Sequence, residues 1–258
     1  MPRFSANLSM LFKEVGFLDR FDRAAAAGFK GVEFLFPYEW DKEELVDLLQ
    51  RNSFEMVLHN LPAGDWNAGE RGIASLADRV EEFQRGVALA TEYAAALKCP
   101  RLNCLAGIPP VTQDRDRTLE TLISNVRYAA EETSKKGIQL VVEAINSDDM
   151  PGFYLNSTRQ VVDLLKAVDH PNAFIQYDVY HMQIMEGNLT KTIRQNVDRI
   201  GHIQLADVPG RHEPGTGEIN FPNLFRAIDE TAYDGWIGCE YVPSQSTEQS
   251  LGWLTDYL

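Results

Sequence analysis

The chain is poor in cysteine and in basic residues, and it has no long apolar run. Its three cysteines, an odd number without CxxC spacing, are typical of reduced intracellular thiols. The formal net charge of −14 argues against nucleic acid as a partner, because such binding depends on positive charge. No segment is long enough to span a membrane, and the first residues carry too short an apolar run for a signal peptide. We therefore expect a soluble cytoplasmic protein with no nucleic-acid or membrane partner.

The chain has enough apolar residues to fill a sizeable core. Hydrophobic residues make up 44% of the sequence, which excludes a mostly disordered chain. A length of 258 residues fits two small domains or one (β/α)8 barrel, which typically needs about 250 residues. No low-complexity linker divides the sequence, so we predict a single domain over residues 1–258.

Segments with strand character alternate with segments of helical spacing from end to end. The predicted strands cover residues 4–9, 31–36, 56–61, 101–107, 139–145, 173–181, 200–207 and 236–242. The predicted helices cover residues 17–28, 41–51, about 77–98, 118–136, 157–168, 189–199, 221–231 and 247–258. Strict alternation produces parallel strands with crossover helices, and eight such units predict an α/β fold, the (β/α)8 TIM barrel. An open doubly wound sheet is the alternative, but no phosphate-binding glycine loop follows the first predicted strand.

Each predicted strand carries a polar residue near its C-terminal end, where the active sites of this barrel lie. The strand of residues 174–181, FIQYDVYH, shows the pattern most clearly, because a carboxylate such as Asp178 is costly to bury unless it is paired or bound to a cation. The eight residues are Asn7, Glu33, His59, Asn103, Glu143, Asp178, Gln204 and Glu240. Eight polar strand ends together indicate a site rather than a structural coincidence.

The last four of these residues predict a metal site. Glu143, Asp178, Gln204 and Glu240 follow one another about one βα unit apart, so adjacent strands present them to one point. Three carboxylates that converge there repel one another unless a cation lies between them. Ligation by oxygen alone favours Mg²⁺ or Mn²⁺ over zinc. The alternative is a buried ion-pair network with arginine or lysine, although no strand end supplies such a residue.

Five segments spread along the chain form longer motifs. They are RFSANLSMLF at residues 3–12, LHNLPAGDWNAGERGIA at 58–74, IQYDVYHMQ at 175–183, EPGTGEIN at 213–220 and GWIGCEY at 235–241. These segments resemble one known family, the hydroxypyruvate isomerases among the xylose isomerase-like barrels. The resemblance covers essentially the whole chain.

The resemblance implies one divalent metal ion held by Glu143, Asp178, Gln204 and Glu240. It also implies acid–base roles for Glu143 and Glu240, and substrate contacts from two further residues, His181 and Arg211. The related ketose 3-epimerases usually have histidine as the third ligand. Gln204 departs from that pattern and favours Mg²⁺.

Other candidate residues stand near the predicted strand ends. His181 follows Asp178 by three positions and can reach the site or cap the next helix. His59 is either a pocket residue or a core histidine, and Glu70 lies in the following loop as a candidate lid or substrate contact. Arg211 is the only arginine that this assignment places near the site, so we expect it to bind a substrate carboxylate.

The resemblance implies an isomerase that interconverts hydroxypyruvate and tartronate semialdehyde (2-hydroxy-3-oxopropanoate), a reaction of glyoxylate and carbohydrate metabolism. A base removes a proton from the carbon that bears the hydroxyl, a cation stabilises the enediolate, and an acid returns the proton to the other carbon. A metal-assisted hydride shift would use the same residues. The substrate is a small anion, and the sequence is compatible with a homo-oligomer.

Three other functions fit a barrel of this kind. An isomerase of a four-carbon 2-oxo sugar acid needs the same site with a longer pocket. A metal-dependent sugar-acid binding protein would hold the substrate without turnover. Abasic-site endonucleases share the barrel, but they use a histidine-rich zinc cluster and bind DNA, which five scattered histidines and a net charge of −14 argue against.

Overall fold

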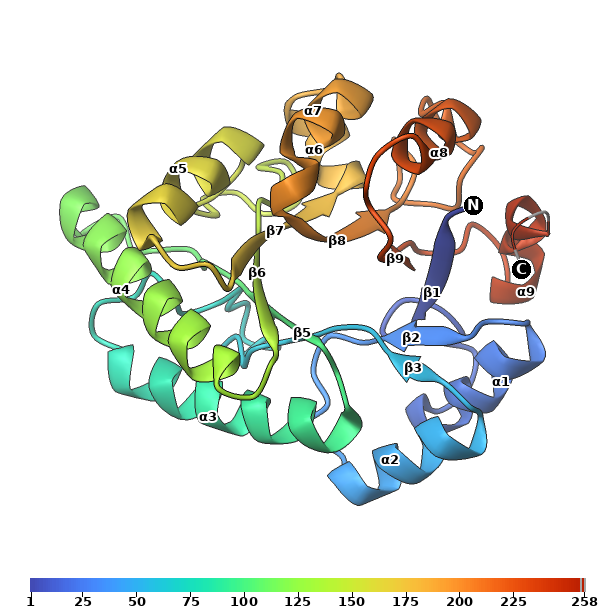
Figure 1. The fold of residues 1–258 in the computed structure, drawn as a ribbon, viewed down its shortest axis with the longest axis horizontal. Helices are drawn as coiled ribbons and strands as arrows, with labels where there is room; N and C mark the ends of the chain where they lie inside the picture. The colour runs from blue at the N-terminus through green and yellow to red at the C-terminus, as the bar shows by residue number, and fades with distance from the viewer. Residues whose placement is uncertain (256, 258) are drawn as a thin grey trace.

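The chain folds around one parallel sheet that curls into a barrel. The structure, a computed structural model, describes residues 1–255 and 257. Within these residues nine strands pair in the order β3-β2-β1-β9-β8-β7-β6-β5-β4. The strands are β1 (Arg3–Asn7), β2 (Gly31–Glu33), β3 (Glu55–Met56), β4 (His59–Asn60), β5 (Arg101–Cys104), β6 (Gln139–Glu143), β7 (Ala173–Asp178), β8 (Ile200–Leu205) and β9 (Trp236–Cys239). Figure 1 shows the strands arranged around a central axis with the helices outside them. The predicted α/β fold and TIM barrel are therefore confirmed.

The third predicted strand is split, which explains why nine strands replace eight. The segment predicted at residues 56–61 forms β3, which pairs with β2, and β4, which pairs with β5. Val57 and Leu58 connect the two strands and still bond to the β2 side, from Val57 N to the carbonyl of Val32 (2.8 Å) and from Phe34 N to the carbonyl of Leu58 (3.3 Å). The ring of strands thus closes through one continuous stretch of chain.

The helices cover the outer face of the sheet (Figure 1). They are α1 (Arg20–Ala26), α2 (Lys42–Arg51), α3 (Val80–Leu97), α4 (Arg115–Ser134), α5 (Thr158–Val168), α6 (Val179–Met185), α7 (Leu189–Asn196), α8 (Phe221–Asp229) and α9 (Thr247–Ser250). Side-chain caps start several of them as the sequence predicts; Asp41, for example, accepts a hydrogen bond from Glu43 N at 2.9 Å. Among the residues that the structure describes, no helix is long and apolar enough to cross a bilayer.

All eight predicted strands end one to three residues earlier than expected, and the closing helix is also shorter than predicted. The strand predicted to reach His181 stops at Asp178, because the Asp178 carboxylate accepts a hydrogen bond from Tyr180 N at 2.8 Å and starts helix α6 there. The closing helix predicted over residues 247–258 is only α9, followed by a 3-10 turn over Gly252–Leu254. Gly252 weakens the helix at this point. Residues 256 and 258 of that prediction lie outside the described residues.

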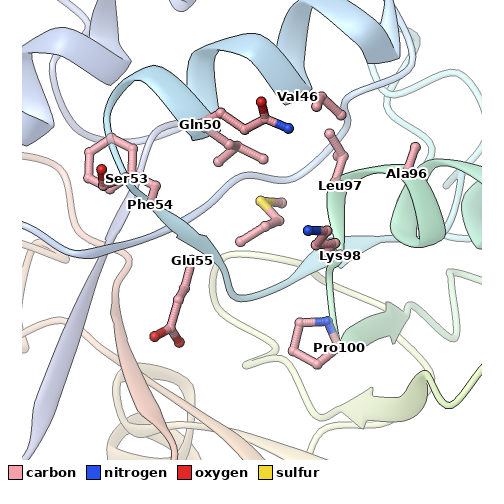
Figure 2. A pocket seen from close by; sticks show the side chains of 11 residues that line it. Val46, Gln50, Ser53, Phe54, Glu55, Ala96, Leu97, Lys98 and Pro100 are labelled. Atoms are coloured by element: carbon pink, nitrogen blue, oxygen red, sulfur yellow. The ribbon is translucent and has the colours of Figure 1, made fainter.

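The two ends of the barrel differ in character. At the start of the strands, α2, α3 and β3 enclose an apolar pocket of about 290 Å³, whose lining includes Val46, Phe54 and Leu97 (Figure 2). A small apolar cluster that includes Val141 and Trp236 is separate from the main core. Polar side chains gather instead where the strands end, and we call that end the mouth of the barrel.

Candidate active site

Side chains from several strand ends and loops meet in one cavity at the mouth. The cavity has a volume of about 80 Å³. Apolar residues, among them Met10, Trp66 and Met150, supply part of its wall. The polar residues that line it are Asn60, Asn103, Glu143, Gln176, His181, Arg211 and Glu240. The predicted metal and substrate residues Glu143, His181, Arg211 and Glu240 therefore share this small space. The predicted metal ligands Asp178 and Gln204 are not part of its wall.

Glu143, Asp178 and His181 are the group of three potential metal-ligand side chains that lie close together within the described residues. One ligand atom from each lies within 4.8 Å of the others, so this Glu-Asp-His cluster could hold a metal ion. His181 Nε2 is 3.6 Å from Asp178 Oδ2 and 4.0 Å from Glu143 Oε1. The structure thus places His181, predicted as a substrate contact, directly among predicted metal ligands.

Arg211 is the cation that faces these carboxylates. Its Nη2 lies 3.3 Å from Asp178 Oδ2 and 3.4 Å from Glu240 Oε1. Burial opposes its charge, but Glu240 and Asp178 outweigh that effect and raise the pKa of the guanidinium. Part of the ion-pair network considered from the sequence is therefore present, with the arginine supplied by a loop instead of a strand end.

The charges of the site leave room for a divalent cation. Burial and the neighbouring Asp178 raise the pKa of Glu143 to about 8. Burial also raises the pKa of Asp178 and, more strongly, that of Glu240. If all three carboxylates ionise, Arg211 balances one of the three negative charges. One divalent cation would balance the two that remain. The oxygen-rich donor set therefore fits such an ion.

His181 is held in one orientation by its neighbours. Asn146 Nδ2 lies 2.7 Å from His181 Nδ1, and Asn146 Oδ1 accepts hydrogen bonds from the backbone N–H groups of Asp148 and Asp149 at 3.0 and 2.8 Å. The amide nitrogen of Asn146 therefore donates to Nδ1, which leaves the ring proton on Nε2, toward the carboxylates. Burial and then Arg211 lower the pKa of His181 well below its usual range, so the ring stays neutral.

A second buried network lies beneath the cavity, around Glu33. His202 Nε2 is 2.9 Å from Glu33 Oε2, and Gln204 Nε2 donates to Glu33 Oε1 over 2.8 Å. Glu33, His202 and Gln204 are all fully buried. Burial alone would raise the pKa of Glu33, but His202 and the hydrogen bonds outweigh it and lower the pKa. His202 therefore has a structural role, because it pairs with this carboxylate.

The loop that carries Arg211 is fixed by one buried carboxylate. Asp207 Oδ2 accepts hydrogen bonds from the backbone N–H groups of Gly215 and Gly217, both at 2.9 Å. Asp207 Oδ1 accepts from Val208 N at 2.9 Å and from Ile219 N at 3.0 Å. Asp207 thereby closes the loop on itself and holds it over the mouth. No sequence pattern had indicated this residue.

Two predicted site residues have other neighbours. Glu70 forms an ion pair with Arg79 and accepts a hydrogen bond from Asp65 N at 2.6 Å, within its own loop. The His59 ring packs edge-on against Tyr38, with ring centroids 5.9 Å apart. Burial lowers the pKa of His59 to about 4. Neither Glu70 nor His59 belongs to the wall of the cavity at the mouth.

The sequence reasoning missed three residues that the structure brings to the site. Asn60 lines the cavity in place of its neighbour His59, because the split between β3 and β4 interrupts the regular alternation of that strand. Gln176 lies two residues before Asp178 in the same strand, so both side chains point to the same face. This alternation of strand side chains could have identified Gln176 as a site residue. Asn146 acts from a loop after β6 and leaves no periodic signal.

Comparisons with known proteins agree along the whole chain. The family model described as xylose isomerase-like TIM barrel matches residues 21–257. Hydroxypyruvate isomerase of Escherichia coli (strain K12) is 54% identical over 257 residues, with 100% of both chains covered. The 2-oxo-tetronate isomerase of Pectobacterium atrosepticum is 47% identical, with 100% of this chain and 98% of that protein covered. A solved structure described as AP endonuclease, family 2 from Brucella melitensis is 46% identical, with a TM-score of 0.97 over 100% of this chain and 99% of that one.

Proposed function

This chain belongs to the xylose isomerase-like TIM barrel family, and on that premise we propose that it is an isomerase of a small 2-oxo hydroxy acid. The reaction interconverts hydroxypyruvate and tartronate semialdehyde by moving the carbonyl to the neighbouring carbon. The relative from Escherichia coli, 54% identical over its full length, bears the name of this activity. The protein acts on a small anionic molecule.

One observation carries the proposal: Glu143 and Glu240 line the same 80 Å³ cavity as Arg211. An isomerisation of this type needs one group that removes a proton and one that returns it. Two carboxylates of raised pKa beside a guanidinium supply both groups and a partner for the substrate carboxylate. We assign Glu143 and Glu240 to the proton transfers and Arg211 to the substrate carboxylate.

We propose that Glu143, Asp178, Gln204 and Glu240 hold one divalent ion, Mg²⁺ or Mn²⁺. When bound, such an ion supplies Lewis acidity toward the substrate oxygens and stabilises the negative charge that develops on them. The support is the oxygen donor set and the two negative charges that Arg211 leaves unbalanced. His181, 3.6 Å from Asp178 Oδ2, lies beside this set as a hydrogen-bond donor, because Asn146 leaves its ring proton on Nε2.

The remaining contacts orient the reacting groups. Asn103 Nδ2 donates to Glu143 Oε2 at 2.8 Å, which fixes the carboxylate plane and leaves Oε1 for the substrate. His181, whose proton is on Nε2, donates a hydrogen bond to a substrate oxygen.

The alternative substrate is a four-carbon acid, because the Pectobacterium atrosepticum relative is named 2-oxo-tetronate isomerase at 47% identity. The reaction is the same carbonyl shift, with one more hydroxyl-bearing carbon. A cavity of 80 Å³ is about half of the ~150 Å³ that holds benzene in an engineered protein cavity. That volume favours acids of three or four carbons over six-carbon sugars.

Hydrolysis of abasic DNA is less well supported, although the Brucella melitensis structure is described as an AP endonuclease. A protein of net charge −14 repels the phosphate backbone, on which such binding depends. We also propose a cytoplasmic location, since Cys99, Cys104 and Cys239 are free, buried thiols.

Proton NMR in deuterated water tests the proposal. Enzyme loaded with Mg²⁺ receives hydroxypyruvate or the four-carbon 2-oxo acid. The expected product is the aldehyde from hydroxypyruvate or the 3-oxo acid from the four-carbon substrate, with deuterium at the newly protonated carbon. Product without deuterium would show that the substrate hydrogen moves without solvent exchange, as in a hydride shift. Binding of both acids without any product would show a binding protein and would refute the isomerase. The variant Glu143→Gln is the matched control for contaminating activity.

A further inference from the structure

We propose that Glu33 is a positioning residue that turns the side-chain oxygen of Gln204 toward the metal site. The inference rests on the proposed function, in which Gln204 is a metal ligand. It adds a role for a residue that touches neither substrate nor metal. The two ends of the Gln204 amide have similar shapes but opposite hydrogen-bonding character, since the nitrogen donates and the oxygen accepts.

Glu33 is an acceptor surrounded by donors. Ser5 Oγ donates to Oε2 at 3.0 Å and Asn7 Nδ2 donates to Oε1 at 3.1 Å. His202 Nε2 lies 2.9 Å from Oε2, and Gln204 Nε2 donates to Oε1 at 2.8 Å. Since these partners come from β1 and β8, the carboxylate is fixed from several sides.

Glycine at position 238 makes room for this carboxylate. A Cβ atom on Gly238 would lie 2.3 Å from Glu33 Oε1, well inside contact distance. Strand β9, which contains Gly238, ends directly before Glu240. The barrel is therefore shaped around Glu33 immediately below the proposed ligands.

The orientation of the Gln204 amide follows from its two partners. Its nitrogen donates to Glu33, and its oxygen accepts a hydrogen bond from Gln176 Nε2 at 2.6 Å. If the amide were rotated by half a turn, its oxygen would face the Glu33 carboxylate and its nitrogen would face the donor of Gln176. Both hydrogen bonds would become repulsive contacts between like groups. Glu33 therefore fixes the oxygen as the end of the Gln204 amide that faces Gln176, a residue of the cavity wall, and this oxygen keeps a second lone pair for a metal.

Metal binding to metal-free enzyme tests the inference independently of turnover. The variant Glu33→Gln can donate its own NH₂ group to Gln204 and so permits the rotated amide. Titration with Mn²⁺, followed by calorimetry and by electron paramagnetic resonance of free Mn²⁺, is expected to give an affinity about 10–100-fold weaker than wild type. The matched control Glu14→Gln makes the same chemical change at a carboxylate that accepts from Thr247 N, and it should keep wild-type affinity.

The possible failures are distinguishable. If the wild-type protein binds no Mn²⁺, the proposed metal site fails and the role of Glu33 fails with it. If the wild type binds and folded Glu33→Gln binds equally well, only the positioning role is overturned. Should Glu33→Gln not fold, the double variant Glu33→Gln/His202→Gln removes both members of the buried pair. Wild-type Mn²⁺ affinity in that folded double variant would also overturn the inference, and a 10–100-fold loss would support it.

Discussion

Arg211 and Asp178 are joined across the mouth of the barrel, with Nη2 of the arginine 3.3 Å from Oδ2 of the aspartate. The pair comes from the loop after β8 and from the end of β7, and a second contact from the same nitrogen reaches Glu240 at 3.4 Å. The guanidinium therefore pairs with carboxylates of the protein itself. An incoming substrate carboxylate has to share or replace these contacts.

Replacement of Arg211 by alanine should remove the preference for an anionic substrate. A hydrogen bond to a charged group contributes about 1.5–3 kcal/mol. In the wild type, kcat/KM for hydroxypyruvate should therefore exceed that for glyceraldehyde, which lacks the carboxylate, by roughly 10- to 150-fold. In Arg211→Ala this ratio should fall toward one. Loss of the contacts to Asp178 and Glu240 lowers both rates, but the ratio cancels that common loss. Arg159→Ala, at an exposed arginine, is the control. An unchanged ratio in Arg211→Ala would remove Arg211 from substrate recognition.

Glu143→Gln and Glu240→Gln should each lower kcat by about 10²–10⁴-fold, because an amide cannot carry the proton. The measurement is the initial rate with saturating hydroxypyruvate and Mg²⁺. Glu248→Gln, which changes an exposed carboxylate, should retain full activity. A variant that keeps more than half of the activity would show that its residue is neither the acid nor the base.

Chelation should abolish turnover, and Mg²⁺ or Mn²⁺ should restore it. The physical reason is that Glu143, Asp178 and Glu240 share only one guanidinium in the cavity. The test is the rate after dialysis against EDTA, with the residual metal content measured on the same sample. Full activity in a demonstrably metal-free preparation would contradict the proposed site.

Asp207→Asn should loosen the loop that carries Arg211. An asparagine has one acceptor oxygen, and its NH₂ group would face backbone N–H groups that now bond to the carboxylate. We expect the free energy of unfolding to fall by about 1–3 kcal/mol. The ratio of hydroxypyruvate to glyceraldehyde rates should also move toward that of Arg211→Ala. Urea unfolding and the paired rates measure the two effects, and Asp163→Asn on the surface is the control.

Acid should destabilise the protein partly through His59. Because burial depresses its pKa from 6.5 to about 4, the unfolded chain binds a proton that the folded chain excludes. The stabilisation from His59 is therefore complete above pH 6.5 and is lost as the pH falls from there through about 4. Between pH 7 and pH 5 this loss amounts to about 2 kcal/mol.

His59→Gln removes this contribution, so its free energy of unfolding should fall less with acid than that of the wild type. Urea unfolding at pH 7, 6 and 5 gives the comparison. His170→Gln, at a partly exposed histidine, is the matched control and should follow the wild type. If His59→Gln shows the same pH dependence as the wild type, the ring is not protonated during acid unfolding.

The sequence predicted the barrel well because alternation of strands and helices is a local, repeated signal. It placed Glu143 and Glu240, which lie three βα units apart along the chain, in one site, and the cavity contains both. The predicted substrate, metal and acid–base roles of these residues stay predictions, as does the single-domain assignment over residues 1–258. The early end of β7 escaped the prediction, because the cap made by Asp178 competes with strand propensity.

Contacts across the barrel could not be predicted from the sequence. His202 and Glu33 are 169 positions apart, and nothing in the spacing of either residue points to the other. Arg211 reaches Asp178 only because its loop is closed by Asp207, and hydrogen bonds to backbone groups leave no side-chain pattern. The sequence therefore predicted which polar residues stand at the strand ends. The partner of each side chain became known only from the three-dimensional structure.

The split between β3 and β4 is flanked by the two shortest ladders of the described sheet. The ladders on either side of it, β2–β3 and β4–β5, contain two residue pairs each, whereas β5–β6 and β6–β7 contain four each. The wall on either side of this split is therefore held by fewer ladder pairs, although bonds such as Val57 N to the carbonyl of Val32 (2.8 Å) continue the contact to β2. Strand β4 leads directly into the loop that contains Trp66, so this least-paired part of the sheet carries one wall of the cavity.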